Sequence, residues 1–148
     1  MKKILTIILM AAMTACGCKS HKQVVVNARA EFDDSQVWQL VAMRGKEISY
    51  SEGQKPVTLQ INTEAGTFSG HNGCNRYFGT FKDLGTGKME LNDFNATKRA
   101  CPEAFHKVER SYMQLLTRCD AFELGEYTLR LLQGDKELLA FEKIPPTQ

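Results

Sequence analysis

Glycine recurs at short intervals through the middle of this 148-residue chain, and no other feature constrains its fold as much. Glycines stand at positions 66, 70, 73, 79, 85 and 87, and between them apolar and polar residues alternate over short stretches. Such alternation is typical of half-buried strands, and glycine permits the tight turns that join them. We therefore expect a sheet of short strands.

The predicted strands cover residues 37–42, 57–61, 66–69, 79–82, 88–91, 121–124, 127–132 and 138–144. One helix is predicted over residues 102–117, because Pro102 suits a first helical position and Glu103 suits the positive end of the helix dipole. Apolar side chains then recur at helical spacing, at Phe105, Val108, Tyr112, Leu115 and Leu116. This order predicts the α+β class, with a small antiparallel sheet and one packed helix.

The N-terminus has the pattern of an export signal. Lys2 and Lys3 precede a mostly apolar run over residues 4–12, which is too short to span a bilayer comfortably. The run ends in Met13-Thr14-Ala15-Cys16, the pattern of a lipobox. We expect residues 1–15 to be a lipoprotein signal peptide.

Cleavage before Cys16 would leave that cysteine as the acylated N-terminus, a stable membrane anchor. Cys18 is the alternative acceptor, and a plain secretory signal with two free thiols is the alternative interpretation. Residues 16–35 are then a lipidated N-terminus and tether, and residues 36–148 form the domain. Val24-Val25-Val26 interrupts the tether and is alternatively an edge strand or a patch for a partner.

The charge of the mature chain is balanced. Removal of Lys2 and Lys3 from the 19 basic residues leaves them equal in number to the 17 acidic ones. Phosphate binding requires clustered positive charge, which this sequence lacks. We therefore expect no nucleic-acid partner.

Three segments carry a family resemblance. Trp38-Gln39-Leu40 is similar to a W-x-L opening strand, and the segment GHNGCNRYFGTF, residues 70–81, is similar to the hallmark G-x-x-G-C-N-x-x-x-G-x-Y, with Phe81 in the tyrosine position. The segment ATKRACP, residues 96–102, resembles a T-x-x-x-C stretch that leads into a helix. Together they resemble the META domain family, also called HslJ-like. The matching motif residues are Trp38, Gly70, Gly73, Cys74, Asn75, Gly79 and Cys101.

The resemblance implies a cracked-barrel-like sheet with a helix packed on it. It also implies associations with heat shock, drug tolerance or secretion rather than with a reaction, and no active site or cofactor is carried over. Physically, Gly70, Gly73 and Gly79 permit positive φ, and Asn75 can cap a turn through its side chain. Arg76 and Tyr77 in the hallmark segment could bind a ligand, but we favour the interpretation of an exposed turn.

The cysteines are expected to meet an oxidising compartment, where pairs tend to close. We favour a disulfide between Cys74 and Cys101, the cysteines of the two most specific segments, which would contribute roughly 3 to 4 kcal/mol through loop closure. The alternatives are two buried free thiols, or a bridge from Cys119 to either cysteine. In the absence of such a bridge, Cys119 is expected to be a small core residue.

Two chemical alternatives involve histidine. His71 with Cys74, and Cys101 with His106, could together supply a tetrahedral metal site, although their spacings match no strong zinc pattern. A Cys74 nucleophile activated by His71 or His106 would make the chain a cysteine-dependent hydrolase. We expect neither a metal nor a cofactor.

The leading functional hypothesis is a non-enzymatic lipoprotein of the cell envelope. It would be anchored in the outer membrane, face the periplasm, and bind or interact with a partner protein during envelope stress. The alternative is a carrier of a small apolar ligand or lipid, bound in a pocket that the helix leaves unfilled against the sheet. The helix stripe is otherwise expected to be core.

Overall fold

The computed structural model describes residues 31–145, and within them it contains one antiparallel sheet and one helix. The sheet has nine strands in the order β2-β1-β3-β4-β5-β6-β7-β8-β9. The elements are β1 (Val37–Met43), β2 (Lys46–Glu47), β3 (Val57–Asn62), β4 (Thr67–Asn72), β5 (Arg76–Gly85), β6 (Lys88–Ala96), α1 (Glu103–Leu116), β7 (Ala121–Leu124), β8 (Thr128–Gln133) and β9 (Lys136–Lys143). The predicted α+β class is confirmed.

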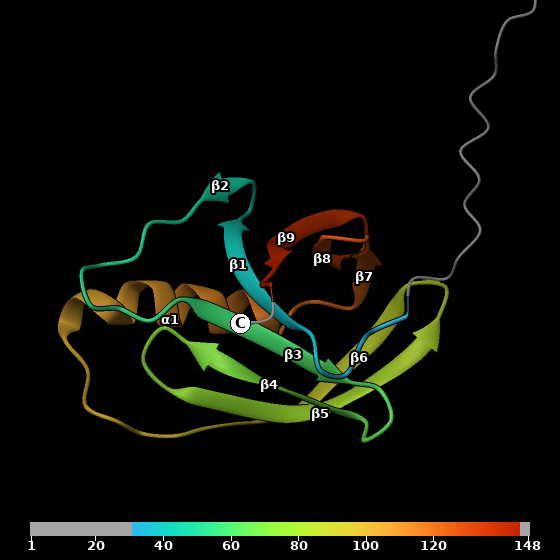
Figure 1. Cartoon of the computed structure of the whole chain (residues 1–148), viewed down its shortest axis with the longest axis horizontal. Coiled ribbons are helices and arrows are strands. Elements are labelled where there is room, and N and C mark those ends of the chain that lie inside the picture. The colour runs from blue at the N-terminus through green and yellow to red at the C-terminus, as the bar shows by residue number, and fades with distance from the viewer. Residues whose placement is uncertain (1–30, 146–148) are drawn as a thin grey trace, which may run out of the picture.

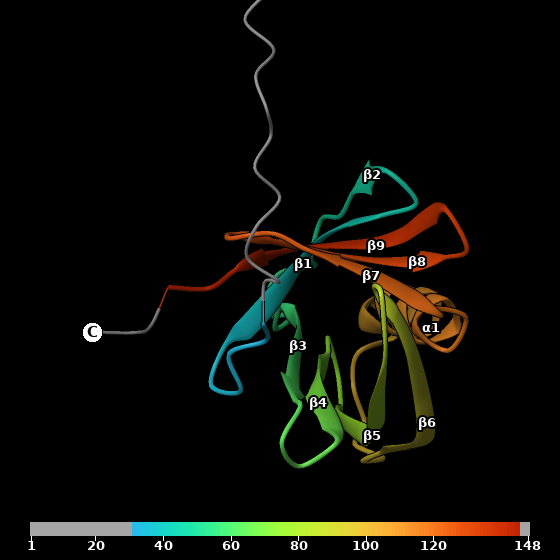
Figure 2. The ribbon, with the colours of Figure 1, turned by 90° about the vertical axis from the view of Figure 1, so that its right-hand side faces the viewer.

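The sheet closes on itself, because β1 also pairs with β9 (Figure 1). The ring is weakest between β6 and β7, where the only paired residues are Lys88 and Ala121. Figure 2 shows α1 between the half of the ring formed by β7–β9 and the half formed by β3–β6. A ring that gapes at one junction, with a helix packed against it, confirms the expected cracked-barrel-like sheet.

Much of the core follows from the alternation of buried and exposed residues along β3 and β5. In β3, Val57, Leu59 and Ile61 are buried while the residues between them are partly exposed. In β5, Tyr77 and Phe81 face inward and their neighbours face solvent. Successive side chains of a strand point to opposite faces of the sheet, so one set of side chains points into the closed ring. These inward side chains form a single core.

The helix supplies its own apolar stripe to this core. Tyr112, Leu115 and Leu116 are at most 5% exposed, and burial of each contributes roughly 2 kcal/mol. The hydroxyl of Tyr112 lies 2.5 Å from that of Tyr77, which donates a hydrogen bond of 2.7 Å to the carbonyl of Thr58. These three residues have the expected core role, whereas Phe105 and Val108 of the predicted stripe are only partly buried. The helix begins at Glu103 rather than at Pro102, whose ψ of 142° is extended.

The hallmark segment is not the exposed turn that we expected. It forms the end of β4, a tight turn at residues 73–75 and the first part of β5, so that Tyr77 is 1% exposed. The predicted strands at residues 66–69 and 79–82 are shorter than β4 and β5, because glycine indicates a turn in the sequence but here lies inside strands. Of its three glycines only Gly73 has a positive φ, of 97°.

Gly70 and Gly79 are instead required by close packing. A Cβ at Gly70 would lie 1.9 Å from the carbonyl oxygen of Thr58 on β3, and one at Gly79 would lie 2.4 Å from the ring of Phe68. Any larger residue would have to push a strand or an aromatic ring away. These glycines therefore allow β3 and the ring of Phe68 to lie closer to the neighbouring backbone than a side chain would permit.

The packed domain begins earlier than the tether boundary predicted at Ser35. The ring of Phe32 lies 5.0 Å from that of Phe122, and the carboxylate of Asp34 accepts a hydrogen bond of 2.8 Å from the amide of Thr63. The predicted signal peptide, the lipidation site Cys16 and most of the tether lie outside the described residues. Within residues 31–145, the helix is neither long nor apolar enough to cross a membrane.

Candidate functional site

The turn between β4 and β5 is built around the side chain of Asn72. Its Oδ1 accepts hydrogen bonds from the amides of Cys74, at 3.2 Å, and Asn75, at 2.7 Å. Gly73 stands at the corner, where a Cβ would lie 2.7 Å from the Nε2 of Gln54. The local sequence NGCN therefore folds into a rigid turn that presents Cys74 and Asn75 toward the start of the helix.

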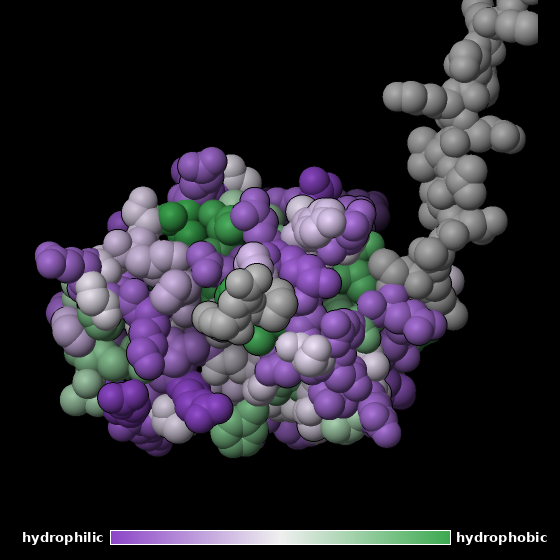
Figure 3. All heavy atoms as spheres, viewed as in Figure 1, coloured by the Kyte–Doolittle hydropathy of each residue, from purple (hydrophilic) through white to green (hydrophobic). Residues whose placement is uncertain are grey.

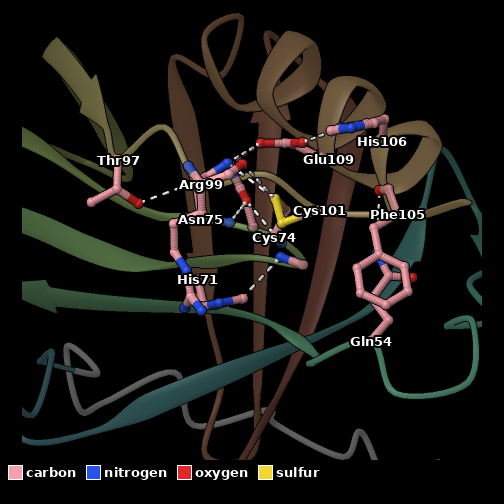
Figure 4. A network of polar contacts seen from close by, with 12 residues as sticks. Gln54, His71, Cys74, Asn75, Thr97, Arg99, Cys101, Phe105, His106 and Glu109 are labelled. Carbon is pink, nitrogen blue, oxygen red and sulfur yellow. Dashed lines mark hydrogen bonds and ion pairs between the residues drawn. A yellow bond between two sulfur atoms is a disulfide. The ribbon is translucent and has the colours of Figure 1, made fainter. Parts of the chain in front are cut away.

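Asn75 connects this turn to the helix and to the segment that precedes it (Figure 4). Its Oδ1 accepts hydrogen bonds from the hydroxyl of Thr97, at 3.1 Å, and the amide of Arg99, at 2.8 Å. Its Nδ2 donates to Glu109 Oε1 at 2.9 Å and to the Cys74 sulfur at 3.2 Å. With both ends of its amide engaged and only 6% of the residue exposed, Asn75 has no group free for a ligand.

Glu109 is the charged centre of the network. Its Oε1 accepts hydrogen bonds from the side-chain amides of Asn72 and Asn75, and its Oε2 lies 2.9 Å from His106 Nδ1. Burial raises the pKa of this carboxyl, but the hydrogen bonds from Asn75, His106 and Asn72 outweigh burial and bring the pKa below its ordinary value. Glu109 is therefore a carboxylate that ties the hairpin to the helix.

A disulfide joins Cys74 to Cys101, the pair favoured above, across a sequence separation of 27 residues. It places the turn directly beside the start of α1 (Figure 4). Cys119 is a free, buried thiol, and burial raises its pKa to about 12. Since the thiolate is the reactive form, Cys119 is chemically inert at neutral pH.

The two histidines lie on different elements around the disulfide. His71, on β4, accepts a hydrogen bond of 3.1 Å from the amide of Gly73, whereas His106, on α1, contacts Glu109. The sulfurs of Cys74 and Cys101 are bonded to each other, so neither is available as a thiolate ligand or nucleophile. Residues 31–145 also contain no cluster of three or more metal-binding side chains.

A small hollow of about 200 Å³ opens beside the disulfide. Its lining includes two cationic side chains, Lys55 and Arg99. Burial, followed by the positive charges of Lys55, Arg99 and Arg76, lowers the pKa of His71. The lowered pKa favours the neutral imidazole, which suits its role as an acceptor for the turn.

A larger open depression of about 530 Å³, here called the helix groove, lies between α1 and the β1–β2 arm. The arm contributes residues between Met43 and Ser49, and the helix contributes Lys107, Val108, Ser111, Gln114 and Leu115. Figure 3 shows hydrophobic surface beside this arm, bordered by hydrophilic residues. The space beneath the helix, where we considered an apolar pocket, is occupied by Tyr112 and Leu116, both 0% exposed.

The structure brings six of the seven motif residues to the β4–β5 hairpin and its contact with α1. The seventh, Trp38, lies in β1 and is a core residue, 3% exposed. Sequence reasoning missed Glu109, although its position gave a signal. It follows Phe105 by four residues and precedes Tyr112 by three, so that it lies on the apolar side of the helix, where a charge needs polar partners.

Comparisons with known proteins identify the family and the fold. The family model of the META domain matches residues 30–145. A search of curated proteins returned no match. The fold resembles an NMR structure of a protein from Burkholderia xenovorans, with 25% identity, a TM-score of 0.58, and coverage of 84% of this chain and 97% of the other.

A second NMR structure has 20% identity and a TM-score of 0.55, with coverage of 74% of this chain and 89% of the other. A crystal structure of a DUF4847 family protein from Bacteroides vulgatus has 17% identity and a TM-score of 0.52, with coverage of 74% and 92%. These two share the fold. The family match spans all of the described residues, and the chain therefore belongs to the META domain family.

Proposed function

We propose that this protein is a lipid-anchored component of the cell envelope whose META domain is a non-enzymatic binding module. The anchor is the acylated Cys16, which follows the apolar run and the lipobox pattern Met13-Thr14-Ala15. The domain faces the periplasm from the outer membrane and acts with a partner protein during envelope stress.

The observation that carries the binding role is the helix groove. Its volume of about 530 Å³ falls in the range of ligand sites, and it opens to solvent along the exposed face of α1. Its lining combines apolar side chains such as Val108 with hydrogen-bonding ones such as Ser111 and Gln114. A surface of this composition suits recognition of a partner.

The hydrogen-bond network at the β4–β5 hairpin supports a structural role for the residues there that could otherwise take part in catalysis. Cys74 is bonded to Cys101, and Asn75 and Glu109 use their polar atoms on the hairpin and the helix. For any of these residues to act in catalysis, its polar group or sulfur would first have to break the bond or hydrogen bond that it makes in the structure. This engagement favours binding over a cysteine-dependent reaction.

The anchor is tested with the full-length chain in a bacterial host. Cys16→Ser is expected to shift the protein from the membrane fraction to the soluble fraction, and Cys18→Ser is the matched control that stays in the membrane. Metabolic labelling with a fatty acid should mark the wild type and the control alone. Release by Cys18→Ser instead would assign the anchor to the other cysteine.

The binding role is tested by site-specific photocrosslinking in living cells. A photoreactive amino acid at position 111, inside the groove, should yield a discrete adduct with an envelope protein, and one at position 98, on an exposed loop, should not. Absence of adducts at both positions would contradict a binding module. An adduct at position 98 alone would keep the binding role and place it elsewhere on the domain.

A further inference from the structure

The helix groove carries an excess of positive charge. Arg44, Lys46 and Lys107 line it with exposed side chains, against the single carboxylate of Glu47. Two of the basic residues come from the β1–β2 arm and one from α1, so that cationic groups stand on both walls. A ligand that lies between these walls gains from negative charge along its length.

The inner lining of the groove is apolar. Met43 and Ile48 of the arm and Val108 of the helix are partly buried and pack against the core, while Leu115 is 5% exposed. Ser111 adds a hydroxyl to the lining. The groove therefore matches a ligand that alternates apolar side chains with acidic ones.

The β1–β2 arm also provides a strand edge. Among residues 31–145, β2 stands at the end of the strand order and pairs with β1 alone, through Glu47 with Ala42 and Lys46 with Met43. An unpaired edge accepts an added strand through backbone hydrogen bonds. Lys46 and Glu47 belong both to this edge and to the groove, so that one extended segment can use the two features together.

We propose that the helix groove binds an extended peptide segment of a partner protein that carries carboxylates beside apolar side chains. This inference rests on the proposed function and names its partner class. An acyl chain fits less well, because the groove is open and would leave much of an apolar ligand in water. A peptide keeps its solvent-facing backbone hydrated and uses the strand edge.

The chain's own tether does not match the groove. Residues 16–30 contain Lys19, Lys22 and Arg29 and no acidic residue, so like charges would oppose their docking on Lys46 and Lys107. The occupant expected from charge complementarity is therefore a different chain.

The experiment measures fluorescence anisotropy with the full-length lipoprotein in detergent micelles. The probes are a short labelled peptide that alternates glutamate with leucine and its counterpart that alternates lysine with leucine. The acidic peptide should bind saturably, and its affinity should fall at least about tenfold in the double variant Lys46→Glu/Lys107→Glu. The same variant should gain affinity for the lysine peptide.

Lys98→Glu is the matched control, because Lys98 is exposed and lies outside the groove. It should leave both affinities within about twofold, and thermal melting should show that each variant is folded. Ser111→Trp, which fills the groove without a change of charge, should also abolish binding.

Equal binding of both peptides, or binding that survives the charge reversal, would overturn the proposal. Displacement of the acidic peptide by dodecanoate at equal concentration would do the same, because it would identify an anionic amphiphile as the occupant. If position 111 crosslinks a partner in cells while the acidic peptide fails to bind, the binding module stands and the peptide class is wrong.

Discussion

Gly70 lies on β4, the strand between β3 and β5. It pairs with Leu59 on one side and Tyr77 on the other, and the hydroxyl of Tyr77 reaches across it to the carbonyl of Thr58. A methyl group at Gly70 would contact both of the last two groups, at 2.7 and 1.9 Å. The residue is therefore required for its lack of a side chain, since its φ is not positive.

Gly70→Ala is expected to destabilise the domain by about 3 kcal/mol, because β3 must shift and the Tyr77 hydrogen bond is lost. Gly134→Ala is the control, since Gly134 has a φ of 58° but open space around it. It should cost about 1 kcal/mol from backbone strain alone. Urea denaturation measures both, and equal losses would show that the strand approach is not the constraint.

The lowered pKa of Glu109 predicts how the free energy of unfolding depends on pH. Its pKa is lower in the folded domain than the ordinary value of 4.5, so the folded state binds protons less readily than the unfolded chain. The stability it provides is complete above pH 4.5 and is lost as the pH falls through the folded pKa. Glu109→Gln should cost about 1 kcal/mol at neutral pH and flatten the loss below pH 4.5.

Urea denaturation measures the free energy of unfolding between about pH 3 and pH 7, a range that includes the ordinary pKa of the carboxyl group. Glu137→Gln is the comparison, because Glu137 on β9 forms an ion pair with Arg130 on β8 at 3.3 Å, away from the network of Glu109. The loss of stability should be small, as expected for an ion pair that remains partly exposed to solvent. Parallel pH profiles for wild type and Glu109→Gln would contradict the role assigned to Glu109.

At the scale of elements, the sequence predicted the helix well and the hairpin poorly. The helical spacing of Tyr112, Leu115 and Leu116 reports directly on burial, and the observed helix ends within one residue of each predicted boundary. Glycine, in contrast, signals either a turn or a close approach, and only the neighbouring strands distinguish these. Gly70 and Gly79 were close approaches and made β4 and β5 appear too short.

The candidate site, too, could be predicted from the sequence only in part. The sequence identified Cys74, Asn75 and Cys101, because they lie in segments that resemble a known family. It did not identify the helix groove, since that depends on where the two-residue strand β2 and its arm lie against α1. A strand of two residues has too little alternation to be recognised from sequence.

The disulfide is expected to stabilise the contact between hairpin and helix. Its loop of 27 residues predicts a loss of about 3 to 4 kcal/mol for the double variant Cys74→Ala/Cys101→Ala. Cys119→Ala is the control and should lose about 1 kcal/mol, because it deletes one small buried group. Calorimetry compares them, and non-reducing peptide mapping should link Cys74 to Cys101. A linked Cys74 and Cys119 peptide would contradict this pairing.

At the scale of the whole molecule, the ring is unevenly closed. β4 pairs with β5 through five consecutive residues, and β7 pairs with β8 through four, whereas β6 and β7 meet at one pair. Two backbone hydrogen bonds reinforce that junction, from Met89 to Asp120 and from Phe122 to Gly87. The helix packs on β9 and β4, so that it bridges the two halves of the ring without sealing the gap.

This unevenness predicts where the sheet opens first. Local opening needs the least free energy where the fewest hydrogen bonds break, so the amides of Met89 and Phe122 should exchange with deuterium before those of β4 and β5. The disulfide and Glu109 lie at the β4–β5 side, and their loss should speed exchange there without changing the β6–β7 junction. Hydrogen exchange followed by NMR resolves these amides individually. If Met89 and Phe122 were protected as strongly as the amide of Tyr77, the ring would be closed uniformly, and the gap between β6 and β7 would have no energetic consequence.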